Sequence, residues 1–130
     1  MNLPVQYTPG LGLNSFADKA DQFLRGEDTP SNFLDRCITS INTQEPEVKA
    51  WVTTRLDAVQ AEAKTADRRY ASGTPLSPVD GMPIGIKDVI QTRDMPTKFG
   101  SPIFDNNETG FDSASVEHCG VPAHSLLENL

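Results

Sequence analysis

A lysine and an aspartate close a short apolar run in the second half of the chain. The run extends from Pro83 to Ile86, is entered through a turn that contains Gly81, and is followed directly by Lys87 and Asp88. A short apolar run between turn residues is typical of a buried strand, which would bring the Lys-Asp pair to the edge of a sheet. A lysine at such an edge could take part in catalysis.

Lysine can act as the general base for a serine nucleophile. A serine hydroxyl attacks weakly until a neighbouring base removes its proton. A lysine is that base only if burial lowers the pKa of its amine enough to leave it neutral, and the run from Ile84 to Ile86 could bury Lys87 in this way. From these residues alone, a solvated lysine at a strand end is the simpler interpretation.

Glycines ahead of a lysine also occur in the phosphate-binding P-loop, but the spacing here differs. The P-loop has four residues between its glycines, followed by Gly-Lys and a Ser or Thr. In this chain three residues separate Gly81 from Gly85, and Ile86 intervenes before Lys87. Asp88 would also place a negative charge where a metal-bound phosphate needs a hydroxyl. The sequence therefore excludes a P-loop, and we expect no cofactor.

Two blocks of residues resemble those of a known family. Residues 81–88, Gly-Met-Pro-Ile-Gly-Ile-Lys-Asp, are similar to the block that carries the catalytic lysine of the amidase signature family. Residues 95–101, with Met-Pro-Thr and Gly-Ser, resemble the block that follows it, and the resemblance as a whole covers residues 14–118. These enzymes hydrolyse or transfer amides with a Ser, cis-Ser, Lys triad. The resemblance implies that Lys87 is the catalytic lysine, whereas Asp80, where the family often has His, is not a triad position.

Other residues that could supply a nucleophile are discounted. Cys37 lies on the apolar stripe of a predicted helix and is interpreted as a small core residue. Ser101 follows Gly100, and Gly-Ser is also an ordinary turn. Cys37 and Cys119 lie far apart in sequence, which favours reduced thiols over a disulfide.

The apolar periodicity predicts three helices before the lysine strand, near residues 15–25, 30–43 and 56–72. Asn14 or Ser15 would cap the first helix, and Thr29 followed by Pro30 is typical of the start of the second. Pro46 is expected to end the second helix. Charged residues on the outer face of the third helix are expected to be solvated, namely Glu62, Asp67, Arg68 and Arg69.

Alternating helices and strands predict an α/β layered fold with a mixed sheet. Residues 50–54 have the aromatic and β-branched content of a short strand, and a second strand runs from Ile84 to Lys87. The resemblance implies the amino-terminal part of the amidase signature fold, with helices packed on a mixed sheet that is incomplete in this chain.

Composition indicates one soluble globular domain of 130 residues, with 37% hydrophobic and 22% charged residues. The net charge of −7 opposes direct binding to nucleic acid. We expect no membrane span and no secretory signal, hence a cytoplasmic protein. His118, Cys119 and His124 lack a second ligand pair at zinc-finger spacing, so no metal site is expected.

The end of the chain departs from the family pattern. Residues 112–118 resemble the family's next helix, which usually continues with Leu-Arg-Ala-Ala-Gly-Ala, aliphatic residues and Gly-Lys-Thr. Here Gly120 and Pro122 interrupt it. If one base was lost after codon 118, the neighbouring frame permits Leu-Arg-Arg-Ala-Gly-Ala-Phe-Ile-Leu-Gly-Lys-Ser. We therefore interpret residues 1–13 as an irregular arm, 14–118 as a partial amidase domain and 119–130 as a divergent, out-of-frame tail. A natural short protein is the alternative.

The resemblance places the family's two serines and its oxyanion-hole amides beyond this break. The leading hypothesis is an amidase that cleaves C–N bonds other than peptide bonds in small-molecule amides, with Lys87 as base and with no activity in the 130-residue chain alone. The alternatives are a fragment of the A subunit of a glutamine-dependent tRNA amidotransferase, and a non-enzymatic remnant that binds a partner. Val89 favours the small-molecule amidase, because the amidotransferase commonly has Asn at that position.

Overall fold

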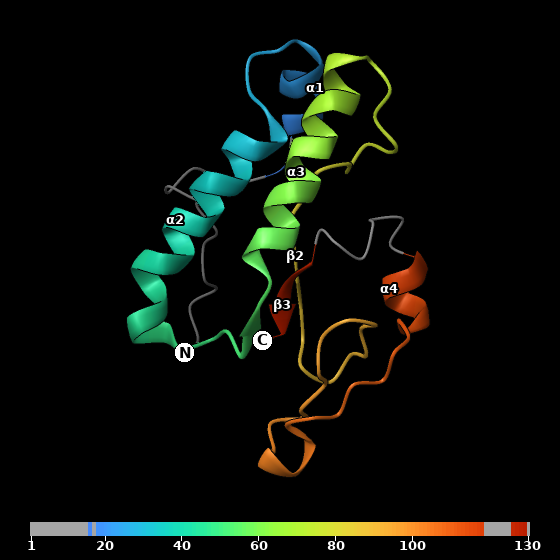
Figure 1. The fold of residues 1–130 in the computed structure, drawn as a ribbon. Coiled ribbons are helices and arrows are strands. Elements are labelled where there is room, and N and C mark those ends of the chain that lie inside the picture. The colour runs from blue at the N-terminus through green and yellow to red at the C-terminus, as the bar shows by residue number, and fades with distance from the viewer. Residues whose placement is uncertain (1–15, 17, 119–125, 130) are drawn as a thin grey trace, which may run out of the picture.

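The computed structural model describes Phe16, residues 18–118 and residues 126–129. Helices α2 and α3 lie side by side, with a small sheet beyond the start of α3 and a long loop and α4 on the other side of that sheet (Figure 1). In chain order the elements are α1 (Lys19–Leu24), α2 (Pro30–Val48), β1 (Thr53–Thr54), α3 (Leu56–Ala71), β2 (Ile84–Ile86), the 3₁₀ helix η1 (Pro102–Phe104), α4 (Ala114–His118) and β3 (Leu126–Asn129).

Helix α1 is shorter than the predicted helix over residues 15–25. It begins after Asp18, whose φ of 63° is left-handed, and the predicted caps Asn14 and Ser15 lie outside the described residues. Aromatic packing holds α1 in place, because the Phe23 ring meets the Tyr70 ring of α3 edge to face at 5.1 Å between centroids. The Asp18 side chain makes no capping hydrogen bond, so packing against α3 stabilises α1 without help from that residue.

Helix α2 begins where the sequence predicts but ends later. The Thr29 hydroxyl accepts a hydrogen bond from the Asn32 N–H at 3.1 Å, with Pro30 in the first turn. The prediction that Pro46 ends the helix is wrong, because α2 continues to Val48. A proline this close to the end removes one hydrogen bond, and the last turn is still closed by Lys49, whose N–H donates to the Glu45 carbonyl at 2.9 Å.

The main helical contact is between α2 and α3. Leu34 of α2 packs with Val59 and Ala63 of α3, and partly buried residues surround them, namely Ile38, Ile41, Trp51 and Leu56. The third predicted helix, over residues 56–72, is confirmed as α3 to within one residue. The alanines on the inner face of α3, Ala63 and Ala66, are buried.

The charged outer face of α3 is not simply solvated, so that expectation is wrong for most of its members. Asp67 accepts hydrogen bonds from the backbone N–H and the hydroxyl of Ser31, at 2.9 Å and 2.6 Å. Glu62 and Arg69 are only partly exposed, and Arg68 alone is exposed as expected. The start of α2 and the segment after α3 both return over this face, which no helical periodicity can indicate.

The strands form a small sheet in the order β1-β3-β2. Strand β3 is antiparallel to β1 and parallel to β2, with irregular register between Ile84 and Gly85. The strand expected over residues 50–54 is reduced to Thr53 and Thr54. The buried strand expected from Ile84 to Lys87 is found as β2, with Ile86 buried and Ile84 partly buried. The prediction is wrong for Lys87, which lies just outside the strand and is exposed.

Cys37 is half-buried beside the aromatic cluster of Phe23, Phe33 and Tyr70. Burial raises the pKa of its thiol more than the charge of Arg36 lowers it. This environment disfavours the thiolate that a cysteine nucleophile needs. The interpretation of Cys37 as a packing residue therefore fits its surroundings.

No helix among the described residues is long and apolar enough to cross a membrane. Within the same residues, no group of three or more His, Cys, Asp or Glu side chains could hold a metal ion. Two of the three imagined zinc ligands, Cys119 and His124, lie outside the described part of the chain.

Candidate active site at Lys87

Lys87 follows the last residue of β2 and is exposed. Successive side chains of a strand point to opposite faces, so Ile86 faces the core with Met95 and Val116 while Lys87 faces away. The expected burial of the lysine by the run 84–86 is therefore not found. The described residues do not supply the enclosure that a neutral lysine base requires.

The backbone around Lys87 is nevertheless well fixed. Its carbonyl accepts hydrogen bonds from the N–H groups of Val89 and Ile90, at 2.7 Å and 2.9 Å, so the chain turns directly after the lysine. Ile86 on the preceding side is buried. The position of the lysine Cα therefore depends on contacts on both sides of it.

The next residue, Asp88, joins the two blocks that carry the resemblance. Its carboxylate is buried and accepts the backbone N–H groups of Lys98 at 2.7 Å and Gly100 at 3.1 Å. Its carbonyl accepts the N–H of Phe99 at 3.0 Å. Three consecutive N–H groups of the second block thus bind one residue of the first. The sequence indicated that the blocks follow one another but not that Asp88 connects them.

The loop between β2 and α4 is anchored from within. Met95 packs against Ile86, and the Thr97 N–H donates to the Asn107 carbonyl at 3.1 Å. The Asn107 side-chain amide donates back to the Thr97 carbonyl at 2.9 Å. Ser101 precedes η1, and its N–H donates to the Lys98 carbonyl, which is the turn expected of Gly-Ser.

Replacing Thr97 with valine should not lower the free energy of unfolding and should raise it by up to about 1 kcal/mol. The Thr97 hydroxyl is fully buried and has no hydrogen-bond partner among the described residues. Valine has nearly the same shape and removes the unpaired polar group. Urea unfolding of the chain measures the change.

Thr92→Val is the matched control, because Thr92 is equally buried but its hydroxyl donates to the Met95 carbonyl at 3.4 Å. We expect this variant to lose about 1 kcal/mol. Equal losses for both valine variants would show that the Thr97 hydroxyl does have a partner.

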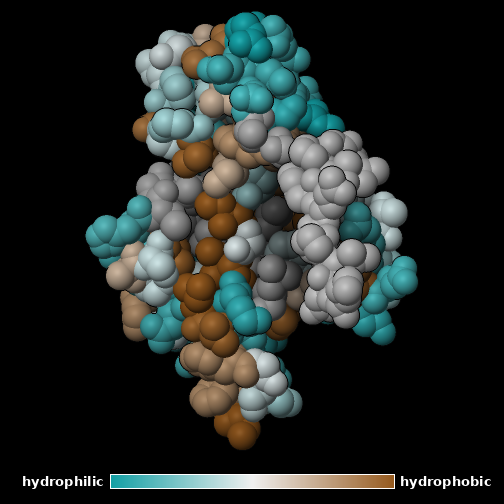
Figure 2. Space-filling view, turned by 180° about the vertical axis from the view of Figure 1, so that it is seen from behind, coloured by the Kyte–Doolittle hydropathy of each residue, from teal (hydrophilic) through white to brown (hydrophobic). Residues whose placement is uncertain are grey.

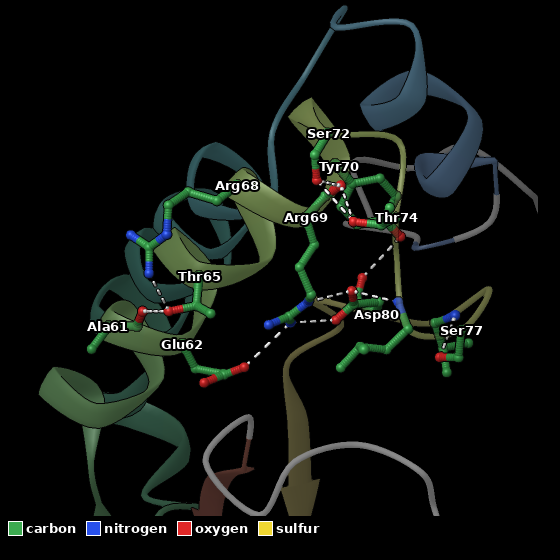
Figure 3. A network of polar contacts seen from close by, with 12 residues as sticks. Ala61, Glu62, Thr65, Arg68, Arg69, Tyr70, Ser72, Thr74, Ser77 and Asp80 are labelled. Carbon is green, nitrogen blue, oxygen red and sulfur yellow. Dashed lines mark hydrogen bonds and ion pairs between the residues drawn. The ribbon is translucent and has the colours of Figure 1, made fainter.

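A buried ion pair lies just ahead of the lysine block. Arg69 of α3 donates to both oxygens of Asp80, from Nε at 2.8 Å and from a terminal nitrogen at 2.6 Å. Figure 3 shows the guanidinium between Asp80 and Glu62, whose carboxylate lies at 3.2 Å. The Leu76 N–H also donates to the Asp80 carboxylate, at 3.0 Å. The Tyr70 hydroxyl donates to the backbone carbonyl of Asp80, at 3.0 Å. Asp80 therefore fixes the segment between α3 and β2.

Burial by itself would raise the pKa of Asp80, whose side chain is 0% exposed. The hydrogen bonds and charge of Arg69, with backbone N–H groups of Leu76 and Gly81, outweigh burial and hold this pKa below its usual value. Burial, and then the Asp80 charge, raise the pKa of Tyr70. Asp80 is therefore an ionised structural carboxylate.

Gly81 carries the chain through a narrow gap. Its φ is +78°, and a Cβ there would lie 2.9 Å from the Pro30 Cβ and 3.2 Å from the Ala66 Cβ. Only glycine fits both the left-handed backbone and this approach to α2 and α3. Asp80 and Gly81 together determine where the lysine strand starts, although nothing in the sequence pattern assigned Asp80 a role.

Large apolar side chains are exposed in the loop that follows the lysine. They are Val89, Phe99, Ile103, Phe104 and Phe111. The rings of Phe99 and Phe104 meet edge to face at 5.3 Å between centroids. Figure 2 shows a band of hydrophobic residues that extends down to the lower tip, where Figure 1 places η1. The candidate site is thus an exposed amine on a fixed backbone, with an apolar surface close to it in the chain.

Comparisons with known proteins agree with the two blocks. The family model described as Amidase matches residues 32–119, which is more than half of the chain. The A subunit of the glutamyl-tRNA(Gln) amidotransferase of Chloroflexus aggregans is 39% identical over 105 residues, which cover 81% of this chain and 22% of that protein. The corresponding protein of Roseiflexus sp. is 34% identical over 116 residues, which cover 89% of this chain and 24% of that protein. The chain thus spans less than a quarter of the length of these relatives.

Solved structures show the same fold. A native peptide amidase from Stenotrophomonas maltophilia has a TM-score of 0.77 and 22% identity, covering 91% of this chain and 24% of the amidase. A chain of the vestigial complex that reveals the evolutionary origins of an s-triazine catabolic enzyme also has a TM-score of 0.77, at 21% identity, covering 89% and 26%. The α/β architecture around Lys87 is therefore shared with these proteins. With the family model matched over both blocks, this chain belongs to the amidase signature family.

Proposed function

We propose that this chain carries the general base, Lys87, of an amidase that cleaves the C–N bond of small-molecule amides. The observation that supports this most directly is the connection of the two family blocks through Asp88, which sets the lysine beside the loop of the second block. In the reaction implied by the family, a serine oxygen attacks the amide carbonyl carbon. Its proton passes through the bridging serine to the Lys87 amine, and then to the leaving amine. Water releases the acid from the resulting acyl-enzyme.

We further propose that the described sheet is part of a larger mixed sheet. Lys87 is exposed, and Ile103, at 87% exposure, lies in the loop beyond it. The serines and the oxyanion-hole donors would come from the rest of an amidase domain, which would also enclose the lysine. Residues 14–118 are then a partial domain, and residues 119–130 a divergent tail.

A second candidate is the A subunit of a tRNA-dependent amidotransferase. The identity of 39% with the Chloroflexus aggregans protein supports it, whereas Val89 in place of the common Asn supports the small-molecule amidase. Amide formation that depends on a partner protein would favour the amidotransferase, and hydrolysis of simple amides without a partner would favour the amidase.

We expect the 130-residue chain alone to hydrolyse no amide. General-base assistance contributes only about 10²- to 10⁴-fold and needs a positioned nucleophile, and oxyanion donors usually supply the largest contribution. The test is an assay of the purified chain against aliphatic and aromatic amides. Turnover by this chain that Lys87→Ala abolishes would show that a nucleophile lies within it.

The same assay should be run on a second protein for comparison. Its gene has one base restored after codon 118, so that translation continues in the downstream frame and gives a longer product. We expect the longer product to contain a Gly-Ser-rich segment and to hydrolyse amides. A downstream sequence without such a segment would rule out the frameshift interpretation and would leave the natural short protein.

A further inference from the structure

We propose that Asp88 is a positioning residue for Lys87 and not its counter-ion. The inference rests on the proposed function, because it gives Asp88 a role only if Lys87 is the base. Sequence alone suggests a Lys-Asp pair that delivers both charges to a sheet edge. The structure separates them, since Lys87 is exposed and Asp88 is 4% exposed.

The carboxylate of Asp88 is occupied by backbone donors. One oxygen accepts the Lys98 N–H at 2.7 Å and the other accepts the Gly100 N–H at 3.1 Å. Two hydrogen bonds to a buried carboxylate are stronger than bonds to a neutral acceptor. The negative charge is therefore directed at the loop of the second block.

The loop is shaped to make this contact. Phe99 and Gly100 have φ values of 53° and 66°, so two consecutive residues are left-handed. The N–H groups of Lys98 and Gly100 then point at one carboxylate, as N–H groups do in backbone anion-binding nests, while the Phe99 N–H between them binds the Asp88 carbonyl. A phenylalanine in this conformation is unfavourable, and the three hydrogen bonds that Asp88 accepts from Lys98, Phe99 and Gly100 compensate for it.

The consequence for Lys87 is a backbone held on both sides. Ile86 is fixed in the core, and Asp88 is fixed in the loop, while the Lys87 carbonyl closes a turn with Val89 and Ile90. The lysine side chain can then meet a nucleophile without its Cα moving, which general-base catalysis requires. Asp88 exerts this effect through the backbone and needs no contact with the amine.

The test is Asp88→Asn in the full 130-residue chain labelled with ¹⁵N, followed by amide hydrogen exchange. Asparagine keeps the shape but places an NH₂ group against one of the two donors. We expect protection of the Lys98 and Gly100 amides to fall at least about tenfold. Protection of Val89 and Ile90 should fall with it, while Leu34 and Val59 in the helical core keep theirs.

Asp105→Asn is the matched control, because Asp105 lies in the same loop but is exposed, and its carboxylate lies 3.7 Å from the Lys98 amine. This variant should leave the hydrogen-exchange protection of all these amides unchanged. Asp88→Glu should fail to restore protection, because a longer side chain does not fit the buried site.

Two results would overturn the proposal. Unchanged protection of Val89 and Ile90 in Asp88→Asn would show that Asp88 does not fix the lysine turn. An equal fall at every amide, including Leu34 and Val59, would show a general loss of stability. The hydrogen-exchange measurements do not depend on catalytic turnover, so they test the role of Asp88 separately from the proposed function. The proposed function would fail if Lys87→Ala in the longer, read-through product were still active.

If Asp88→Asn does not fold, the wild-type chain still tests the proposal. Amide protons bound to a carboxylate resonate downfield of unstructured ones. We therefore expect downfield amide protons for Lys98 and Gly100. Chemical shifts of these two amide protons that are typical of unstructured chains would overturn the inference.

Discussion

Replacing Asp80 with asparagine should lower the free energy of unfolding of this chain by about 3 kcal/mol or more. The side chain of Asp80 is fully buried and forms two hydrogen bonds with Arg69, which is itself only 17% exposed. Asparagine removes the carboxylate that binds the guanidinium at two points and leaves only the single contact with Glu62. It also weakens the bond from the Leu76 N–H. Urea unfolding at neutral pH measures the loss.

Glu62→Gln is the matched control for this experiment. Glu62 contacts the same guanidinium at 3.2 Å, but through a single bond and with 17% of its side chain exposed. We expect it to cost less than about 1 kcal/mol. Equal effects of the two substitutions would mean that Arg69 is held by its charge environment in general and not by Asp80.

The same pair predicts how stability depends on pH. A carboxyl group whose pKa is lower in the folded chain contributes stability fully above its unfolded pKa of about 3.9, and this is lost as the pH falls through the folded value. Asp80 and Asp28, whose pKa is lowered chiefly by its hydrogen bond with Arg36, both behave in this way. The chain should therefore lose stability below about pH 4, and Asp80→Asn should reduce that loss.

Features set by neighbouring residues were predictable from the sequence. The start of α2 depends on Thr29 and Pro30, which act within one helical turn, and α3 depends on apolar spacing within one segment. The end of α2 was not predictable from Pro46 alone, because the hydrogen bonds around Glu45 close the last turn. Its carboxylate accepts the N–H groups of Ala50 and Trp51 at 3.1 Å and 2.9 Å.

The candidate site likewise has one part that the sequence predicted and another that it did not. Lys87 was found from its block, but its exposure follows from strand alternation relative to the buried Ile86. The roles of Asp80 and Asp88 depend on partners 10 to 12 residues away, at Arg69, Lys98 and Gly100. Pairing at that distance requires the turns between the partners, and the left-handed Phe99 has no clear signal in sequence.

Replacing Lys87 with alanine in an amidase-competent longer product should lower turnover by several orders of magnitude. Loss of a general base costs about 10²- to 10⁴-fold, and more where nucleophile and base act as one unit. Lys87→Arg should fail as well, because guanidinium stays protonated and cannot accept the proton. Steady-state assays on an amide substrate measure both variants.

Lys87→Ala and Lys87→Arg should leave folding unaffected, whereas Asp80→Asn should lower the free energy of unfolding. The Lys87 side chain is exposed in the 130-residue chain, and its carbonyl, which closes the turn with Val89 and Ile90, is retained in any substitution. We therefore expect Lys87→Ala to change the free energy of unfolding of that chain by less than about 0.5 kcal/mol. Lys64→Ala, at an exposed position of α3, is the control and should alter neither turnover nor stability. Near-normal turnover of Lys87→Ala in a folded longer product would remove Lys87 from the reaction, and a different residue would then have to be the base.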